Sequence, residues 1–113
     1  MLIKDTFKKL ELTSTNLIYK SLLKKININY SNIGLINISI PKFDTIAGSG
    51  YSYRYLFIIL TKNSKPKKFS IVLDRNEEKE LLKLLKDYNI QYNIKYYDNS
   101  YNNSKINLDK LKR

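Results

Sequence analysis

Lysines at two predicted turns are the residues whose type and spacing most clearly suggest chemistry. Lys24 and Lys25 lie at the first turn, and Lys65, Lys67 and Lys68 lie at the second. Ammonium groups at the ends of several strands can converge into one surface that attracts acidic proteins, phosphate groups or other polyanions. Solvated lysines without a partner are also common at turns. The spacing therefore predicts a candidate binding surface, and we call these five lysines the basic rim.

A second candidate surface combines an arginine with tyrosines. Arg54 follows Tyr51 and Tyr53 in one predicted strand. Further tyrosines lie near the C-terminus, at Tyr92, Tyr96, Tyr97 and Tyr101. Basic groups beside aromatic rings are typical of surfaces that bind single-stranded nucleic acid by stacking. Tyrosine is also an ordinary, half-buried strand residue, so the sequence leaves both interpretations open.

Conventional side-chain catalysis finds little support in the sequence. The 113 residues include no histidine and no cysteine, which excludes Ser-His and Cys-His pairs and the usual zinc ligands. Glu77 and Lys79, with Asp44, could serve a metal-dependent nuclease, but acids in the first turn of a helix normally offset its dipole. Gly48–Gly50 lacks the Gly-Lys-Ser/Thr ending of a phosphate-binding loop. We therefore expect no enzyme activity, metal or cofactor.

The charge of the chain favours an anionic partner. There are 21 Lys and Arg against 10 Asp and Glu, which gives a net charge of +11. Only Arg54, Arg75 and Arg113 are arginines, so attraction through lysine should be diffuse and salt-sensitive, without bidentate recognition. The enrichment in Lys, Asn, Ile and Tyr also matches AT-rich codon usage, which can supply part of the basicity without any function.

Alternation of apolar and polar residues predicts that most of the chain forms β-strands. Ile26, Ile28 and Tyr30, for example, alternate with Asn27 and Asn29, as in a strand with one buried face. The expected strands cover residues 7–13, 17–23, 26–30, 36–40, 51–61 and 68–73. A loop over residues 41–50 is expected between the fourth and fifth strands.

One amphipathic helix is predicted over residues 75–89. Asp74 and Glu77 have the spacing of a capping box. An apolar stripe at helical spacing follows, formed by Leu81, Leu82, Leu84, Leu85 and Tyr88. Residues 91–97 alternate again and can form one more strand. We expect a single compact domain over residues 1–97, with a polar, flexible tail over residues 98–113 that can include a short helix at 107–112.

Parts of this pattern resemble bacterial pleckstrin-homology-like (PH-like) domains over residues 7–89. The segments Leu10–Tyr19 and Ile28–Ile33 are similar to the opening strands of that family, and Ile71–Asp74 followed by Glu80–Leu85 is similar to its last strand and C-terminal helix. The resemblance implies an α+β fold, in which a curved antiparallel sheet of six to seven strands is capped by one amphipathic C-terminal helix. It also implies a scaffold that binds peptides, proteins or lipid headgroups without catalysis.

Two features depart from that family. No tryptophan is present in the helix, and the extended segment 91–97 follows the helix. If residues 91–97 join the sheet, a split β-α-β arrangement becomes the better description.

The leading functional hypothesis is a non-enzymatic module that binds an acidic protein or anionic ligand through the basic rim and the 41–50 loop. One alternative is a single-stranded nucleic-acid-binding protein that uses tyrosines and lysines. Another is a small phage or mobile-element effector that inhibits a host protein. The sequence has no apolar run long enough to cross a bilayer and no apolar signal core at its N-terminus, so we expect a soluble, cytoplasmic protein.

Overall fold

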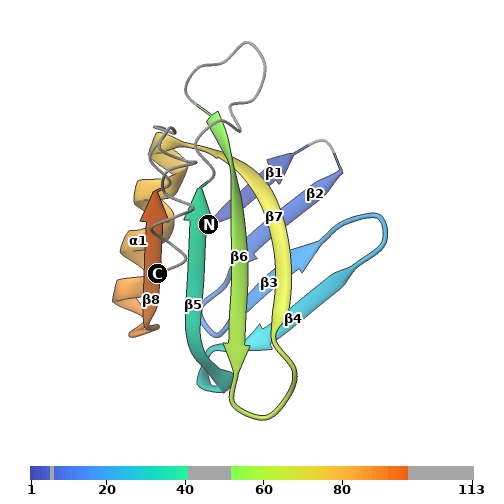
Figure 1. The fold of residues 1–113 in the computed structure, drawn as a ribbon, viewed down its shortest axis with the longest axis vertical. Helices are drawn as coiled ribbons and strands as arrows, with labels where there is room; N and C mark the ends of the chain where they lie inside the picture. Colours follow the sequence, from blue (N-terminus) through green and yellow to red (C-terminus); the bar gives the residue numbers. More distant parts are fainter. Residues whose placement is uncertain (6, 41–51, 97–113) are drawn as a thin grey trace, which may run out of the picture.

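The computed structural model describes residues 1–5, 7–40 and 52–96, which form two four-stranded sheets and one α-helix (Figure 1). The first sheet contains β1 (Leu2–Asp5), β2 (Lys8–Leu12), β3 (Asn16–Lys20) and β4 (Lys25–Asn29), in that order. The second contains β7 (Lys67–Asp74), β6 (Ser52–Thr61), β5 (Ile33–Ile40) and β8 (Tyr92–Tyr96), from edge to edge. The 3-10 turn η1 (Tyr30–Asn32) joins β4 to β5, and helix α1 (Arg75–Asp87) follows β7.

The first sheet is a meander of antiparallel hairpins. Its β3–β4 turn closes where the Ser21 N–H donates to the Lys24 carbonyl at 2.8 Å. The strand predicted over 17–23 therefore ends at Lys20. Leu22 and Leu23 have 75% and 97% of their surfaces exposed at the tip. The predicted strand is too long because Leu22 and Leu23 are apolar, and a sequence pattern does not show whether an apolar residue is buried in a strand or exposed in a turn.

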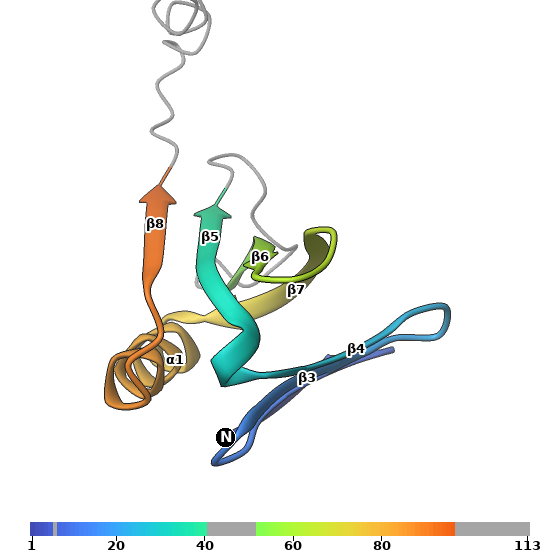
Figure 2. The same cartoon turned by 90° about the horizontal axis from the view of Figure 1, so that it is seen from below.

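The prediction of one curved sheet with six to seven strands is wrong, because eight strands form two separate sheets in the described residues. Strand β1 is absent from the predicted strands, since it is only four residues long and its pattern offers little beyond Ile3, which is 2% exposed. Figure 2 shows the sheets as two layers joined through η1. Each layer buries the apolar face of the other, which a single open sheet of this size could not do.

Residues 92–96 do join a sheet, as strand β8. This strand pairs in parallel with β5, with Ile38 opposite Ile94. Strands β7 and β8 therefore run in the same direction, and α1 carries the chain between them across β6 and β5. A parallel connection needs a long crossover of this kind. The second sheet thus contains the split β-α-β arrangement that the sequence offers as an alternative.

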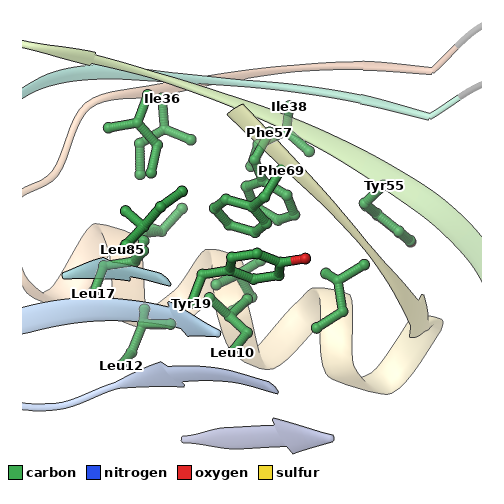
Figure 3. Packing of buried hydrophobic residues seen from close by; sticks show 14 of the residues in the cluster. Leu10, Leu12, Leu17, Tyr19, Ile36, Ile38, Tyr55, Phe57, Phe69 and Leu85 are labelled. Carbon is green, nitrogen blue, oxygen red and sulfur yellow. The ribbon is translucent and has the colours of Figure 1, made fainter. Parts of the chain in front are cut away.

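The core lies between the two sheets and under the helix. A stack of three rings joins the sheets: Tyr19 of β3 lies 4.2 Å from Phe69 of β7, and Phe69 lies 4.7 Å from Phe57 of β6, between ring centroids (Figure 3). All three side chains are buried. Leu81 and Leu85 bring the apolar stripe of α1 into the same cluster. Such buried aromatic pairs each add about 0.5–1.5 kcal/mol beyond the burial of their area.

Helix α1 begins and ends as predicted, within two residues. The Asp74 side chain accepts the Glu77 N–H at 2.8 Å, and the Glu77 side chain accepts the Asp74 N–H at 2.9 Å, so the capping box is confirmed. After the helix, Asn89 has a φ of 60°, the left-handed conformation that Asn tolerates at a C-terminus. The order β7–α1–β8 is thus fixed by local signals at both ends of the helix.

Other expectations fall outside the described residues. The 41–50 loop, Tyr51, Tyr97, Tyr101 and the 98–113 tail with its terminal helix all lie there. In the part of the chain that the structure describes, no helix is long and apolar enough to cross a bilayer.

We predict that Asp74→Ala lowers the free energy of unfolding by about 1 kcal/mol, because it removes the acceptor for a helix N-terminal amide. Urea denaturation measures this change. Glu80→Ala is the matched control, since Glu80 is an exposed acid in the same helix outside the capping box. Equal stability losses in the two variants would contradict the role of the cap.

Candidate basic interaction surface

The structure brings the two turns of the basic rim together. Lys24 of the β3–β4 turn donates from Nζ to the backbone carbonyl of Lys68, at 2.8 Å, although the two residues are 44 positions apart. Lys25, Lys65 and Lys67 are exposed. Lys25 follows Lys24 in the chain, Lys67 precedes Lys68, and Lys65 lies in the β6–β7 turn. The β3–β4 turn therefore lies against the start of β7, which places Lys24 and Lys25 near Lys67 and Lys68.

Two lysine ammonium groups also take part in holding the sheets together. β7 is an edge strand, and its Lys68 and Ser70 carbonyls point away from β6. Lys24 bonds the first of these carbonyls, while Lys8 bonds the second at 3.0 Å and the Ser70 hydroxyl at 3.3 Å. These lysines satisfy backbone acceptors that a neighbouring strand would otherwise take. Lys24 is therefore as much a structural residue as a binding candidate.

The other rim lysines are available for a partner. Within the described residues, the ammonium groups of Lys25, Lys65, Lys67 and Lys68 make no hydrogen bond or ion pair. Lys67 also lines a polar groove of about 170 Å³ between β4 and the β6–β7 turn. The remaining lining residues are mostly amides and hydroxyls: Asn27, Ile28, Asn29, Asn32, Thr61, Asn63 and Ser64. The groove thus has hydrogen-bonding walls and a cation at its edge.

Sequence reasoning missed a row of lysines that crosses the whole first sheet. The strand registers place Lys4 opposite Lys9, Lys9 opposite Lys20, and Lys20 opposite Lys25. Directly opposed residues of antiparallel strands project to the same face. Because Ile3, Leu10, Tyr19 and Ile26 of the adjacent row are buried, the four lysines lie on the outer face, and we call them the lysine ladder. The ladder depends on β1 and on the exact register of three hairpins, and the sequence pattern predicts neither.

The same end of the first sheet exposes apolar side chains next to the lysines. Phe7 is 65% exposed before β2, and Leu22 and Leu23 protrude from the β3–β4 turn. Between these two turns lies a wide, shallow groove of about 310 Å³, whose lining includes three members of the ladder. The full lining comprises Lys4, Phe7, Lys8, Lys9, Lys20, Ser21 and Leu22. Cationic and apolar groups are therefore mixed on this end of the molecule.

Arg54 and Tyr53 of the second candidate surface lie away from the rim. Arg54 lies opposite Val72, whereas the rim residue Lys67 lies opposite Ile59. Five residues along a strand correspond to about 17 Å, so Arg54 and the rim occupy opposite ends of the β6–β7 hairpin. Tyr53 is half-buried, with the Arg75 guanidinium 5.8 Å from its ring centroid. These two residues are therefore separate from the rim.

A buried carboxylate forms a second polar site that sequence reasoning also missed. Glu78 of α1 is 4% exposed. It accepts a hydrogen bond from the Tyr55 hydroxyl of β6 at 2.5 Å and another from the Tyr96 hydroxyl of β8. The sequence pattern indicates an acid that offsets the helix dipole, whereas in the fold Glu78 fastens the helix to two strands of the second sheet. Its helical position next to the capping box gives no signal that it is buried.

These contacts change the acidity of the tyrosines. Burial, followed by the hydrogen bond to Glu78, raises the pKa of Tyr96 to about 12 and also raises the pKa of Tyr55. Tyr30 donates to the Thr13 carbonyl at 2.5 Å and stacks on Tyr88. Burial raises the pKa of Tyr30 to about 12, with a smaller contribution from Tyr88. All three hydroxyls are therefore protonated at neutral pH and donate hydrogen bonds within the fold.

In the described ranges, no group of three or more acids and other metal-ligating side chains is close enough to hold a metal ion. Glu77 is held in the capping box and Glu78 in the tyrosine contacts. Asp44 lies outside the described residues. The described acids of the nuclease hypothesis thus have other partners.

Comparison with known proteins shows which known fold this chain resembles. No family model matches the chain, and no curated protein matches it. The chain is similar to a solved structure, described as that of the Spt16D Pob3N heterodimer, with a TM-score of 0.55 and 20% sequence identity. The fold is PH-like. The match covers 83% of this chain but 49% of the other, so this PH-like chain spans about half the length of the one it matches.

We predict that Tyr55→Phe lowers the free energy of unfolding by about 1–3 kcal/mol, because it leaves a buried carboxylate with one donor fewer. Thermal or urea denaturation at pH 7 measures the loss. Tyr92→Phe is the matched control, since the Tyr92 hydroxyl makes no hydrogen bond within the described residues. A Tyr55→Phe variant as stable as the control would contradict the importance of the Glu78 site.

We also predict that stability falls as the pH rises from 10 to 12. The pKa of Tyr30 is raised from 10.0 to about 12 in the folded state, so its contribution is complete below pH 10 and is lost as the pH rises through 12. Urea denaturation across this range measures the decline. Tyr30→Phe should be less stable at pH 7 but should decline less steeply, and parallel curves for the two proteins would refute the assignment.

Proposed function

We propose that this protein is a non-enzymatic, cytoplasmic binding module of the kind found among bacterial PH-like domains, and that it engages an acidic protein through its basic rim. The observation that supports the proposal most strongly is the contact between Lys24 and the Lys68 carbonyl. It joins two segments that are remote in sequence into one surface with four unpartnered ammonium groups among the described residues. A surface of one charge sign attracts oppositely charged partners and speeds their association.

Several observations support a protein partner over a nucleic acid. The two segments that carry the rim lysines, residues 21–25 and 62–68, contain no arginine and no aromatic residue, whereas single-stranded nucleic acid is usually held by stacking on aromatic side chains and by guanidinium groups. Tyr53 is half-buried beside Arg75, and Tyr96 is bonded to Glu78, so these tyrosines are partly occupied inside the fold. The similar solved structure is described as a heterodimer, which is compatible with a scaffold used for protein association.

We predict that the protein binds polyglutamate and that its affinity falls about tenfold or more between 50 and 200 mM salt, because exposed charges are screened over a Debye length of about 10 Å. Fluorescence anisotropy of a labelled polyglutamate chain measures the affinity. Lys65→Glu combined with Lys67→Glu should weaken binding at least as strongly, since neither ammonium group has a role in the described fold.

The matched control for this pair is Lys79→Glu combined with Lys86→Glu on α1. It changes the net charge by the same amount on exposed residues away from the rim. Equal weakening by both pairs would show that net charge alone attracts the ligand, and the rim assignment would fail. A single-stranded oligonucleotide that binds more tightly than polyglutamate at the same salt concentration would favour the nucleic-acid alternative.

A further inference from the structure

The free edge of β4 combines three features that point to one kind of ligand. It is the last strand of the first sheet, it ends the lysine ladder, and it forms one wall of the polar groove beside Lys67. The basic rim attracts a partner through side-chain charge and uses none of the backbone. The backbone of β4 adds a second, directional means of recognition.

The direction of the β4 backbone groups follows from its two ends. The Tyr30 N–H donates to the Thr15 carbonyl at 2.8 Å, and the Lys24 carbonyl accepts from Ser21 at 2.8 Å. Both residues therefore turn their backbone groups toward β3. Residues of an antiparallel strand alternate in this respect, so the odd-numbered residues Lys25 and Asn27 turn both backbone groups outward. Asn29 turns its N–H outward, while its carbonyl, as the N-cap of η1, accepts the first hydrogen bond of that turn. No strand within the described residues pairs with this edge.

Unpaired edge groups are a template for an added strand. Three outward-facing residues are enough to pair with an extended segment of about five residues, given their two-residue spacing. The free edge of β4 borders the groove, which is lined by Asn27, Asn29 and residues of the β6–β7 turn. The groove supplies amide and hydroxyl groups near the path of such a segment.

The lysine ladder sets the charge of that segment. Each ladder step places two ammonium groups directly opposite each other, and like-charged pairs in this position are destabilising. Lys20 and Lys25 form the last step. The acid nearest on the same face is Glu11, which lies one row away, opposite Leu2 and Ile18. A fifth strand carrying Asp or Glu opposite Lys25 would add the counter-charge that the row lacks.

From these observations we propose that β4 binds an extended acidic segment of a partner protein by strand addition. The segment pairs with the outward backbone groups of Lys25, Asn27 and Asn29, and its acidic side chains continue the lysine ladder and meet Lys67. This inference builds on the proposed function and names the form of the partner. A second copy of this chain is a poorer occupant, since each copy carries a net charge of +11.

The test compares peptides and variants that separate charge from strand pairing. The probes are an eight-residue peptide in which Glu alternates with Val, the same peptide with Lys in place of Glu, and polyglutamate. Asn27→Pro removes the outward N–H at the centre of the edge, which a proline on an edge strand can do without disturbing the pairing with β3. Asn27→Ala is the matched control, because it keeps the N–H and removes the carboxamide.

Strand addition predicts that the alternating Glu peptide binds, that Asn27→Pro weakens it about tenfold or more, and that Asn27→Ala weakens it no more than about threefold, since each lost pairing also misaligns its neighbours. Lys25→Glu should weaken the Glu peptide and strengthen the Lys peptide, because the charge opposite the added strand is reversed. In the unaltered protein, hydrogen exchange of the Asn27 and Asn29 amides should slow when the Glu peptide is added.

Other outcomes overturn the inference in distinguishable ways. Binding of polyglutamate that depends on Lys65 and Lys67, with no effect of Asn27→Pro and no slowing of the Asn27 amide, leaves the rim proposal standing and refutes strand addition. Failure of every acidic probe to bind refutes both proposals. Self-association in sedimentation that Asn27→Pro abolishes would assign the edge to a second copy. Tighter binding to vesicles of anionic lipid than to the Glu peptide, lost when Leu22→Ser and Leu23→Ser are combined, would assign this end of the first sheet to a membrane surface.

Discussion

The burial of apolar faces between two sheets is the constraint on which the rest of this structure depends. Tyr19, Phe69 and Phe57 form a continuous stack from β3 through β7 to β6, and this stack sets how β7 lies across the first sheet. The arrangement puts the edge carbonyls of β7 within reach of Lys24 and Lys8. The basic surface is therefore a consequence of core packing, because the same contact that orders the layers brings the lysine-bearing turns together.

Charge is arranged in this fold according to strand geometry. Lysines that reach the β7 edge are bonded to its carbonyls, whereas those on the outer face of the first sheet oppose each other in the ladder. The first group stabilises the contact between the sheets, and the second opposes the stability of its own sheet. The one deeply buried charge of the described core, Glu78, is satisfied by two tyrosine hydroxyls. The outer face of the first sheet thus carries four lysines with no acid in their row.

The PH-like fold supplies a scaffold and not a function. The similarity to the Spt16D Pob3N heterodimer covers about half of that chain at 20% identity, so it carries information about topology alone. The proposed binding must instead rest on the positions of this chain's own lysines and on the free edge of β4. The contact of Glu78 with Tyr96 fastens the parallel strand β8 to the helix, and its contact with Tyr55 fastens β6.

The sequence by itself determined the elements whose signals are local. The capping box of α1, the alternation in β4 and β6, and the absence of histidine and cysteine are all readable without a structure, because each depends on neighbouring residues or on composition. The division into two sheets, the meeting of Lys24 with Lys68, the lysine ladder and the burial of Glu78 were decided by tertiary structure. Each of these depends on strand register and on contacts between distant segments, which the periodicity of one segment does not encode.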